Sequence, residues 1–195
     1  MFIELTDHLR CPRGHAESYL VLLPERMEGR SVREGRLGCP VCGNTVSLAD
    51  GVLDLGDGPP DPPASTLLQP DPLTALVGLN GPGGYLVLVG RPADAWRAVA
   101  ELNLGVGLVA VNPGPQVTDE PGISVLRSGS LPLKSHSMRG VVLGAPYGDD
   151  PHWVVEGARV VLPGLRVAGE GGVPDSAALQ LMASAGGVWV GTPRR

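Results

Sequence analysis

Runs of consecutive apolar residues alternate with amphipathic segments through the C-terminal two thirds of the chain. The runs are rich in Val and Leu, which is typical of strands buried on both faces of a parallel sheet, and the segments between them have the character of covering helices. We therefore expect a doubly wound, mostly parallel, Rossmann-like α/β domain. Predicted strands lie at 85–89, 105–111, 123–126, 140–145, 164–170 and 188–192, and predicted helices at 73–80, 93–102, 151–158 and 175–185.

The first quarter of the chain has a different pattern, with short alternating stretches at 17–23 and 35–38 and a charged segment between them. These stretches predict strands joined by a charged loop, and a strand, an Asp-Gly turn and another strand follow over 44–55. A proline-rich connector separates this region from the α/β domain. The predicted division is a small β module at 1–56, a linker at 57–72 and an α/β domain at 73–195.

All three cysteines fall in the small module, together with one histidine. Cys11 and His15 form a C-x3-H pair, and Cys39 and Cys42 form a C-x2-C pair within "CPVCG". Two such pairs on tight turns are typical of a zinc ribbon, in which zinc takes four tetrahedral N and S ligands. Four protein ligands leave no open position, so we predict a structural zinc site that supplies stability which so small a module lacks.

Composition and charge narrow the functional classes. With 43% hydrophobic and 18% charged residues the chain can bury a core, and its net charge is −5 with acids in excess in both regions. This balance argues against a nucleic-acid partner, which would require a basic face. No apolar run is long enough for a membrane span, the first residues do not resemble a signal peptide, and three cysteines cannot all pair. We expect a cytoplasmic protein.

The small module resembles a known group of zinc ribbons. The segment "GRLGCPVCGNTVSLADGVLDL" is similar to the second knuckle and the tail of small zinc-ribbon proteins that activate or accompany methyltransferases. A ribbon of this kind also precedes the catalytic domain in some bacterial rRNA guanine methyltransferases. The resemblance implies a protein partner, either an active enzyme or a second copy of the chain.

Three strings in the α/β domain resemble class I S-adenosylmethionine methyltransferases, in the order in which that family has them. They are "SGSLPLKSHSMRGVVLGA" (128–145), "VVEGARVVLPGLRVAGE" (154–170) and "LQLMASAGGVWVGTP" (179–193). The resemblance implies a cofactor held by the glycine turn after the first strand, which corresponds to Gly90, and by an acid at the end of the second strand, where Asn112 stands.

Four positions depart from the family at the places that would face the cofactor. The turn after Gly90 reads Arg-Pro-Ala, Asn112 replaces the ribose-binding acid, 128–130 lacks the acid that contacts adenine, and Met138-Arg139 replaces a Phe-Asp pair. Because fold does not imply function, we favour a degenerate, non-catalytic domain that acts as an interaction or regulatory scaffold and binds no S-adenosylmethionine. Two alternatives stay open: an active methyltransferase that uses Gly90 and Asn112 for the cofactor, and a zinc-ribbon nucleic-acid-binding protein.

Overall fold

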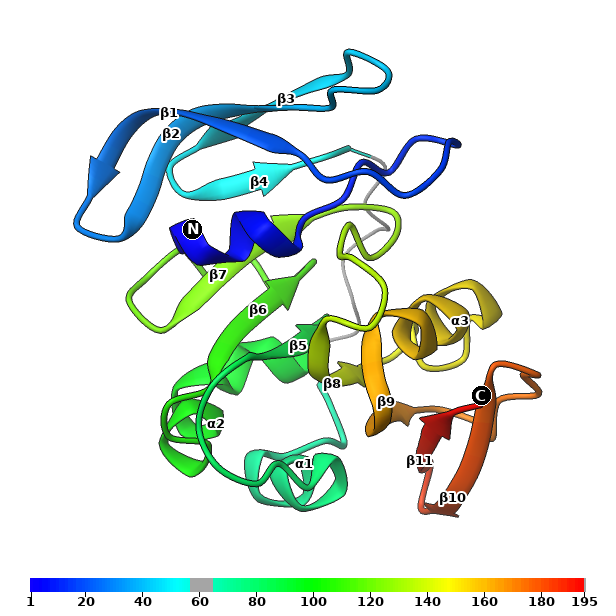
Figure 1. The fold of residues 1–195 in the computed structure, drawn as a ribbon. Helices are drawn as coiled ribbons and strands as arrows, with labels where there is room; N and C mark the ends of the chain where they lie inside the picture. Colours follow the sequence, from blue (N-terminus) through cyan, green and yellow to red (C-terminus); the bar gives the residue numbers. More distant parts are fainter. Residues whose placement is uncertain (57–64, 195) are drawn as a thin grey trace.

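The computed structural model describes residues 1–56 and 65–194, so the first half of the predicted linker (57–64 of 57–72) and the last residue lie outside the described residues. In this part of the chain the strands form one sheet with the order β1-β2-β3-β4-β7-β6-β5-β8-β9-β11-β10 (Figure 1). The strands are β1 (Val21–Glu28), β2 (Ser31–Gly38), β3 (Thr45–Ala49), β4 (Val52–Asp54), β5 (Tyr85–Val89), β6 (Gly107–Val111), β7 (Ile123–Arg127), β8 (Met138–Leu143), β9 (Val161–Glu170), β10 (Leu179–Ala185) and β11 (Val188–Pro193). The helices are η1 (Ile3–His8), α1 (Pro70–Val77), η2 (Arg91–Ala95), α2 (Trp96–Leu102) and α3 (Pro151–Val160).

The centre of the sheet confirms the predicted doubly wound, mostly parallel α/β fold. Strands β5 to β9 pair in parallel, and the chain moves outward from β5 first through β6 and β7 and then through β8 and β9. The order therefore reverses between β5 and β8, where Rossmann-like sheets form a crevice at the carboxyl ends of the strands. The last strand, β11, runs antiparallel between β9 and β10.

Each face of the central sheet buries its own cluster of apolar side chains. On one face Val87, Val109 and Leu126 pack with η1 and α3, and on the other Leu86 and Leu108 pack with α1 and α2. Alternation along each strand sends neighbouring side chains to opposite faces, so the continuous Val/Leu runs supply both clusters.

The small module joins this sheet directly. Strand β4 pairs in parallel with β7, and Leu53 of β4 belongs to the same buried cluster as Leu126 of β7. Arg33 of β2 also binds the carboxylate of Asp119, in the loop between β6 and β7, at 2.7 Å. The ribbon strands and the α/β strands consequently share one sheet and one apolar cluster.

Two sequence-based expectations about secondary structure were wrong. The charged segment between 23 and 35 is not a loop but most of the β1–β2 hairpin, in which Arg26 bonds to Glu34 across the strands at 2.9 Å. Opposite charges on facing strands stabilise such a pair, so the charges mark exposed strand faces. The segment predicted as a helix at 175–185 is instead irregular at 175–178 and then forms strand β10 (Leu179–Ala185).

The turn that follows β10 explains why this segment is a strand. Strand β10 turns into β11 through Gly186 and Gly187, which have φ values of 59° and 79°. Two glycines with positive φ form the two-residue turns that hairpins favour, and pairing with β11 overrides the helix propensity of the alanine-rich segment.

Helix α1 begins earlier than predicted, at Pro70 rather than at residue 73, and ends before Gly78. Proline suits the first turn of a helix, since the N–H that it lacks would have no helical partner there. Among the described residues, no helix has the length and apolar character that crossing a bilayer requires.

Candidate metal centre and candidate cofactor crevice

The four predicted metal ligands come together although the two pairs are far apart in the sequence. The ligand atoms of Cys11, His15, Cys39 and Cys42 all lie within 4.8 Å of one another. The Sγ atoms of Cys11 and Cys42 are 3.8 Å apart, and Cys39 Sγ lies 3.4 Å from His15 Nε2. This group could hold a metal ion.

The spacing of these atoms fits a tetrahedral ion. Two Zn–S bonds of about 2.3 Å at a tetrahedral angle place the sulfur atoms about 3.8 Å apart, and one Zn–S and one Zn–N bond place their ends about 3.5 Å apart. The observed distances of 3.8 Å and 3.4 Å are close to both values. The donor set and its geometry therefore suit zinc.

Local hydrogen bonds fix which atom of His15 faces the cysteines. His15 Nδ1 lies 2.7 Å from the carbonyl oxygen of Ala16. Because a carbonyl oxygen only accepts, Nδ1 carries the proton in this bond and Nε2 keeps its lone pair directed at the sulfur atoms. A histidine ligand is commonly oriented in this way by a bond from its second nitrogen.

The turns around the cysteines make the thiols unequal. Burial raises the pKa of the Cys11 thiol to about 11, and its cysteine neighbours add to this rise. Burial also opposes ionisation of Cys39, but backbone N–H groups of Cys42 and Val41 donate to its sulfur and lower its pKa to about 6. The second knuckle thus stabilises a thiolate, which is the form that binds metal.

A cluster of ion pairs connects the first knuckle to α3. Arg10 Nη2 lies 3.1 Å from Glu156 Oε2, and Arg159 Nε lies 2.7 Å from Glu156 Oε1. Glu17, on the other side of the knuckle, accepts hydrogen bonds from the N–H and the hydroxyl of Ser135. Residues on both sides of Cys11 and His15 are therefore held by the α/β domain.

At the carboxyl end of β5, the candidate cofactor crevice is filled by a side chain of the same molecule. Gly90 has a φ of 73°, and a Cβ added to it would lie 2.8 Å from Cε2 of Tyr147. Tyr147 is 1% exposed and its ring packs edge-on against Trp153, with ring centroids 4.7 Å apart. Pro92, on the same turn as Gly90, packs against Gly144 at the end of β8. The glycine of this turn therefore accommodates a tyrosine ring.

Asn112 lies beside Gly90, whose N–H donates to the carbonyl oxygen of Val111. The amide nitrogen of Asn112 donates to the Ser128 carbonyl oxygen at 2.8 Å, and Oδ1 of Asn112 accepts from the Ser128 N–H at 2.9 Å. Asn112 is buried, with an exposed fraction of 8%. Both ends of the amide therefore clamp β6 to the segment after β7.

Carboxylates near the strand ends are also engaged with the backbone. Asp94 accepts from the Gly114 N–H at 3.1 Å and pairs with Arg91 at 3.0 Å, which ties the turn after β5 to the loop after β6. Glu170, at the end of β9, accepts from the N–H groups of Leu68 and Ala145 at 2.8 Å and 3.0 Å. Both carboxylates are therefore engaged by backbone N–H groups.

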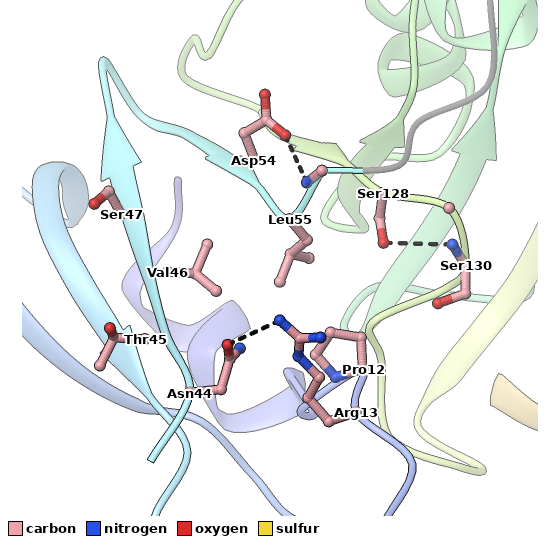
Figure 2. A pocket seen from close by; sticks show the side chains of 12 residues that line it. Pro12, Arg13, Asn44, Thr45, Val46, Ser47, Asp54, Leu55, Ser128 and Ser130 are labelled. Carbon is pink, nitrogen blue, oxygen red and sulfur yellow. Dashed lines mark hydrogen bonds between the residues drawn. The ribbon is translucent and has the colours of Figure 1, made fainter. Parts of the chain in front are cut away.

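A cavity of about 590 Å³ lies on the metal-centre side of the molecule rather than at Gly90. Arg13 and Asn44 of the two knuckles line it together with Leu55 and the 128–130 segment, as Figure 2 shows. Arg13 bonds to Asn44 Oδ1 at 3.4 Å, and the side chains of Val46 and Leu55 form an apolar part of the wall.

Sequence reasoning identified the four residues that lie together as a candidate metal site but missed the residues that fill the crevice. Tyr147 lies in "GAPYG", which reads as an ordinary Pro/Gly loop, and its packing on Gly90 joins segments 57 positions apart. The ion pair between Glu156 and Arg159 could have been predicted from the sequence, because opposite charges three residues apart on a helix lie side by side.

Comparisons with known proteins return no assigned family. No protein-family model matches the sequence, and no curated protein matches it. Solved structures do align with part of the chain. A complex between the Trm112 methyltransferase activator of Haloferax volcanii and a protein named as a methyltransferase aligns at 25% identity with a TM-score of 0.38, over 45% of this chain and 45% of that chain.

Two further structures align over about half of the chain. A geranyl diphosphate methyltransferase in complex with GPP and sinefungin gives 17% identity and a TM-score of 0.43, over 50% of this chain and 41% of that chain. A protein from Anabaena variabilis, named as a methyltransferase from an antibiotic biosynthesis pathway, gives 18% identity and a TM-score of 0.42, over 51% and 43%. The chain aligns with less than half the length of each of these three structures.

Proposed function

We propose that this chain is a zinc-stabilised, non-catalytic protein whose Rossmann-like domain has lost its cofactor and which acts by binding another protein. The observation that carries the proposal is the closed crevice at the switch point of the sheet. Methyltransferase-like domains would need small residues at the turn after β5 and an acid at the end of β6. Here Tyr147 packs on Gly90, and Asn112 is bonded at both ends to Ser128.

The residues present do not fit S-adenosylmethionine. A ribose binds through two charged hydrogen bonds to a carboxylate, whereas Asn112 offers a neutral amide whose oxygen already accepts from a backbone N–H. Displacing the Tyr147 ring would break its contacts with Trp153 and leave a buried void. We therefore assign no catalytic residue to this chain.

We assign zinc to the Cys11, His15, Cys39 and Cys42 group, in a structural role. Four protein ligands fill a tetrahedral shell and leave no position for a substrate. Reduced cysteines and a thiolate-stabilising knuckle suit the cytoplasm, where thiols remain unpaired.

The ribbon's charges support a protein partner over a nucleic acid. Arg26, Arg33 and Arg36 are each paired with a carboxylate, as are Arg10 and Arg30. Arginines held in this way have few donors to offer to phosphates. The resemblance of the ribbon to proteins that accompany methyltransferases points to the same class of partner.

Calorimetric titration with S-adenosylmethionine and S-adenosylhomocysteine tests the loss of the cofactor. The zinc-loaded chain should give no heat and no thermal shift at millimolar cofactor. Dissociation constants in the micromolar range would overturn the proposal and favour an active enzyme with an atypical site. Metal analysis of the same sample should find one zinc per chain, and a chain that folds fully without metal would contradict the structural role of the cluster.

A further inference from the structure

The sheet has two free edges among the described residues, β1 at one end and β10 at the other (Figure 1). An unpaired edge strand can pair with another chain, and proteins usually prevent this with proline, charged residues or bulges. The two edges of this sheet differ in how far they are protected.

Strand β1 carries several of these protective features. It contains Pro24, which cannot donate a ladder hydrogen bond, and its pairing with β2 is irregular at two places. Glu25, Arg26 and Glu28 lie on it and pair with charges of β2 or of each other. A strand added to this edge would have to accommodate the proline and a row of charges.

Strand β10, by contrast, has neither proline nor any charged residue in its sequence LQLMASA. It pairs only with β11, and one irregularity between Leu181 and Ala183 is its single protective feature. Six of its seven residues are exposed, including Leu181 at 42% and Met182 at 52%. An exposed, uncharged and apolar edge of this length is the kind of edge that takes up a further strand.

An apolar groove lies beside this edge. A cavity of about 370 Å³ separates α1 from the β10–β11 hairpin and is lined by Leu67, Leu76, Ala183, Ala185 and Trp189, among others. Leu67, on the rim of this groove, is 62% exposed. Edge and groove form a continuous apolar surface, which marks an interaction site on a soluble protein.

We propose that a second copy of this chain binds here, with β10 of each copy pairing antiparallel across a two-fold axis near Met182. A two-fold contact requires a surface that complements itself. Strand β10 meets this condition because it carries no charge, whereas self-pairing of β1 would bring Glu25, Arg26 and Glu28 of both copies into one interface. The net charge of −5 repels two copies elsewhere, so a neutral strand is the surface on which they can approach.

The groove supplies area that strand pairing lacks. A stable interface buries about 800 Å² per partner, more than a seven-residue strand pair provides by itself. Because β10 lines the groove, a strand added to its edge lies along the opening, and the apolar side chains of that strand can enter it. This inference goes beyond the proposed loss of the cofactor and does not depend on it.

Sedimentation velocity of the full zinc-loaded chain, from about 1 to 100 µM, tests the proposal through matched variants on the two edges. We expect the wild type to be a dimer in this range. Met182→Glu should raise its dissociation constant at least about tenfold, because two carboxylates then face each other near the axis. Met27→Glu makes the same change on β1, where Met27 is 40% exposed, and should leave the dimer intact.

A charge-reversed pair tests the two-fold arrangement itself. Met182→Glu and Met182→Lys should each be monomeric alone and should form a heterodimer when mixed, since opposite charges then meet near the axis. A monomeric wild type would overturn the proposal, and so would a dimer broken by Met27→Glu but not by Met182→Glu.

The outcomes separate this proposal from the proposed function. A monomer that gives no heat with S-adenosylmethionine would retain a non-catalytic protein with its partner on another surface. A dimer that binds S-adenosylmethionine would retain the β10 interface and overturn the loss of the cofactor.

Discussion

The metal centre and the switch-point crevice are both built from segments far apart in the chain, yet their polar atoms are arranged in opposite ways. At the metal centre three sulfurs and one imidazole nitrogen face a common point. At the crevice the polar groups face one another in donor–acceptor pairs, as Asn112 and Ser128 do. A cluster of electron-pair donors is incomplete without a cation, whereas paired groups leave nothing for a ligand to satisfy.

This difference has an energetic basis. Thiolates held close together repel one another, and a metal ion turns that repulsion into four bonds. A buried amide with both ends bonded has no such deficit, and a ligand that displaced its partners would have to replace each lost bond. The metal centre should therefore respond strongly to changes in its ligands, and the crevice should respond only to changes that break its internal pairs.

The largest effect is expected from Cys39→Ser, which removes the thiolate that the backbone of the second knuckle stabilises. We expect loss of the bound zinc and a fall of more than about 3 kcal/mol in the free energy of unfolding. This is a part of the roughly 10–16 kcal/mol that zinc supplies to isolated fingers, because the ribbon strands keep the shared apolar cluster. Metal analysis and chemical denaturation measure the two quantities.

Val41→Ser is the matched control, since Val41 lies in the same knuckle and its side chain is 65% exposed. Chelation should have the same result as Cys39→Ser in amide spectra: signals of the two knuckles, at 11–15 and 39–44, should lose dispersion while the ribbon strands and the α/β domain stay folded. Dispersed signals for both knuckles after chelation would contradict a structural zinc.

The next effect is expected from Glu156→Gln, which breaks the link between the first knuckle and α3. Removing one member of a buried ion pair leaves the others without compensation, and we expect a loss of about 2–4 kcal/mol at pH 7. Glu101→Gln, on an exposed position of α2, should change stability by less than about 0.5 kcal/mol.

The same variant has a defined pH dependence. Burial would raise the pKa of Glu156, but hydrogen bonds from Arg159 and the charges of Arg159 and Arg10 outweigh it and hold the pKa below its ordinary value of 4.5. A lowered folded-state pKa contributes stability above the unfolded-state value, and that stability is lost as the pH falls through the folded-state value. The difference between wild type and Glu156→Gln should therefore shrink as the pH falls below 4.5. A difference that stays constant on acidification would show that this carboxylate is not the group responsible.

A smaller effect is expected from Asn112→Asp, which supplies the acid that a cofactor-binding domain would carry. The new carboxylate can still accept from the Ser128 N–H, but its other oxygen replaces the amide nitrogen that donates to the Ser128 carbonyl oxygen. Two acceptors then face each other in a buried place, and we expect a loss of about 1–3 kcal/mol. Asn80→Asp is the exposed control, and S-adenosylmethionine should still give no heat with Asn112→Asp. A gain of binding would mean that the crevice lacked only its acid.

The parts of the structure that were predictable from the sequence are those governed by local periodicity and by short spacings. The Val/Leu runs predicted the parallel strands β5 to β9, and the C-x3-H and C-x2-C spacings predicted a group of four ligands that lie together. Both signals are local, since a run of five residues or a knuckle of four needs little information from the rest of the chain.

The features that sequence reasoning missed depend on partner strands rather than on the periodicity of a single segment. Strand β10 is set by its pairing with β11, and the charged strands β1 and β2 are set by each other. No spacing rule predicts that the ribbon joins the α/β sheet through β4 and β7, because 68 residues separate Asp54, at the end of β4, from Ile123, at the start of β7. Tertiary contacts decided each of these elements against local propensity.

The smallest effect is expected from Tyr147→Phe, and its small size is informative. The ring of Tyr147 fills the crevice, but its hydroxyl is buried and makes no hydrogen bond of ordinary geometry among the described residues; burial raises its pKa, and the nearby Asn112 side chain offsets this rise only in part. Removing a buried polar group that has no partner costs nothing in hydrogen bonding, so the free energy of unfolding should stay within about 0.5 kcal/mol or rise slightly. Tyr19→Phe, at a 55% exposed position, gives the reference for the same change in solvent. Because the ring stays against Gly90, Tyr147→Phe should bind S-adenosylmethionine no better than the wild type. A loss of more than about 1.5 kcal/mol would mean that the hydroxyl has a hydrogen-bond partner, and the side chain of Asn112 would be the first candidate.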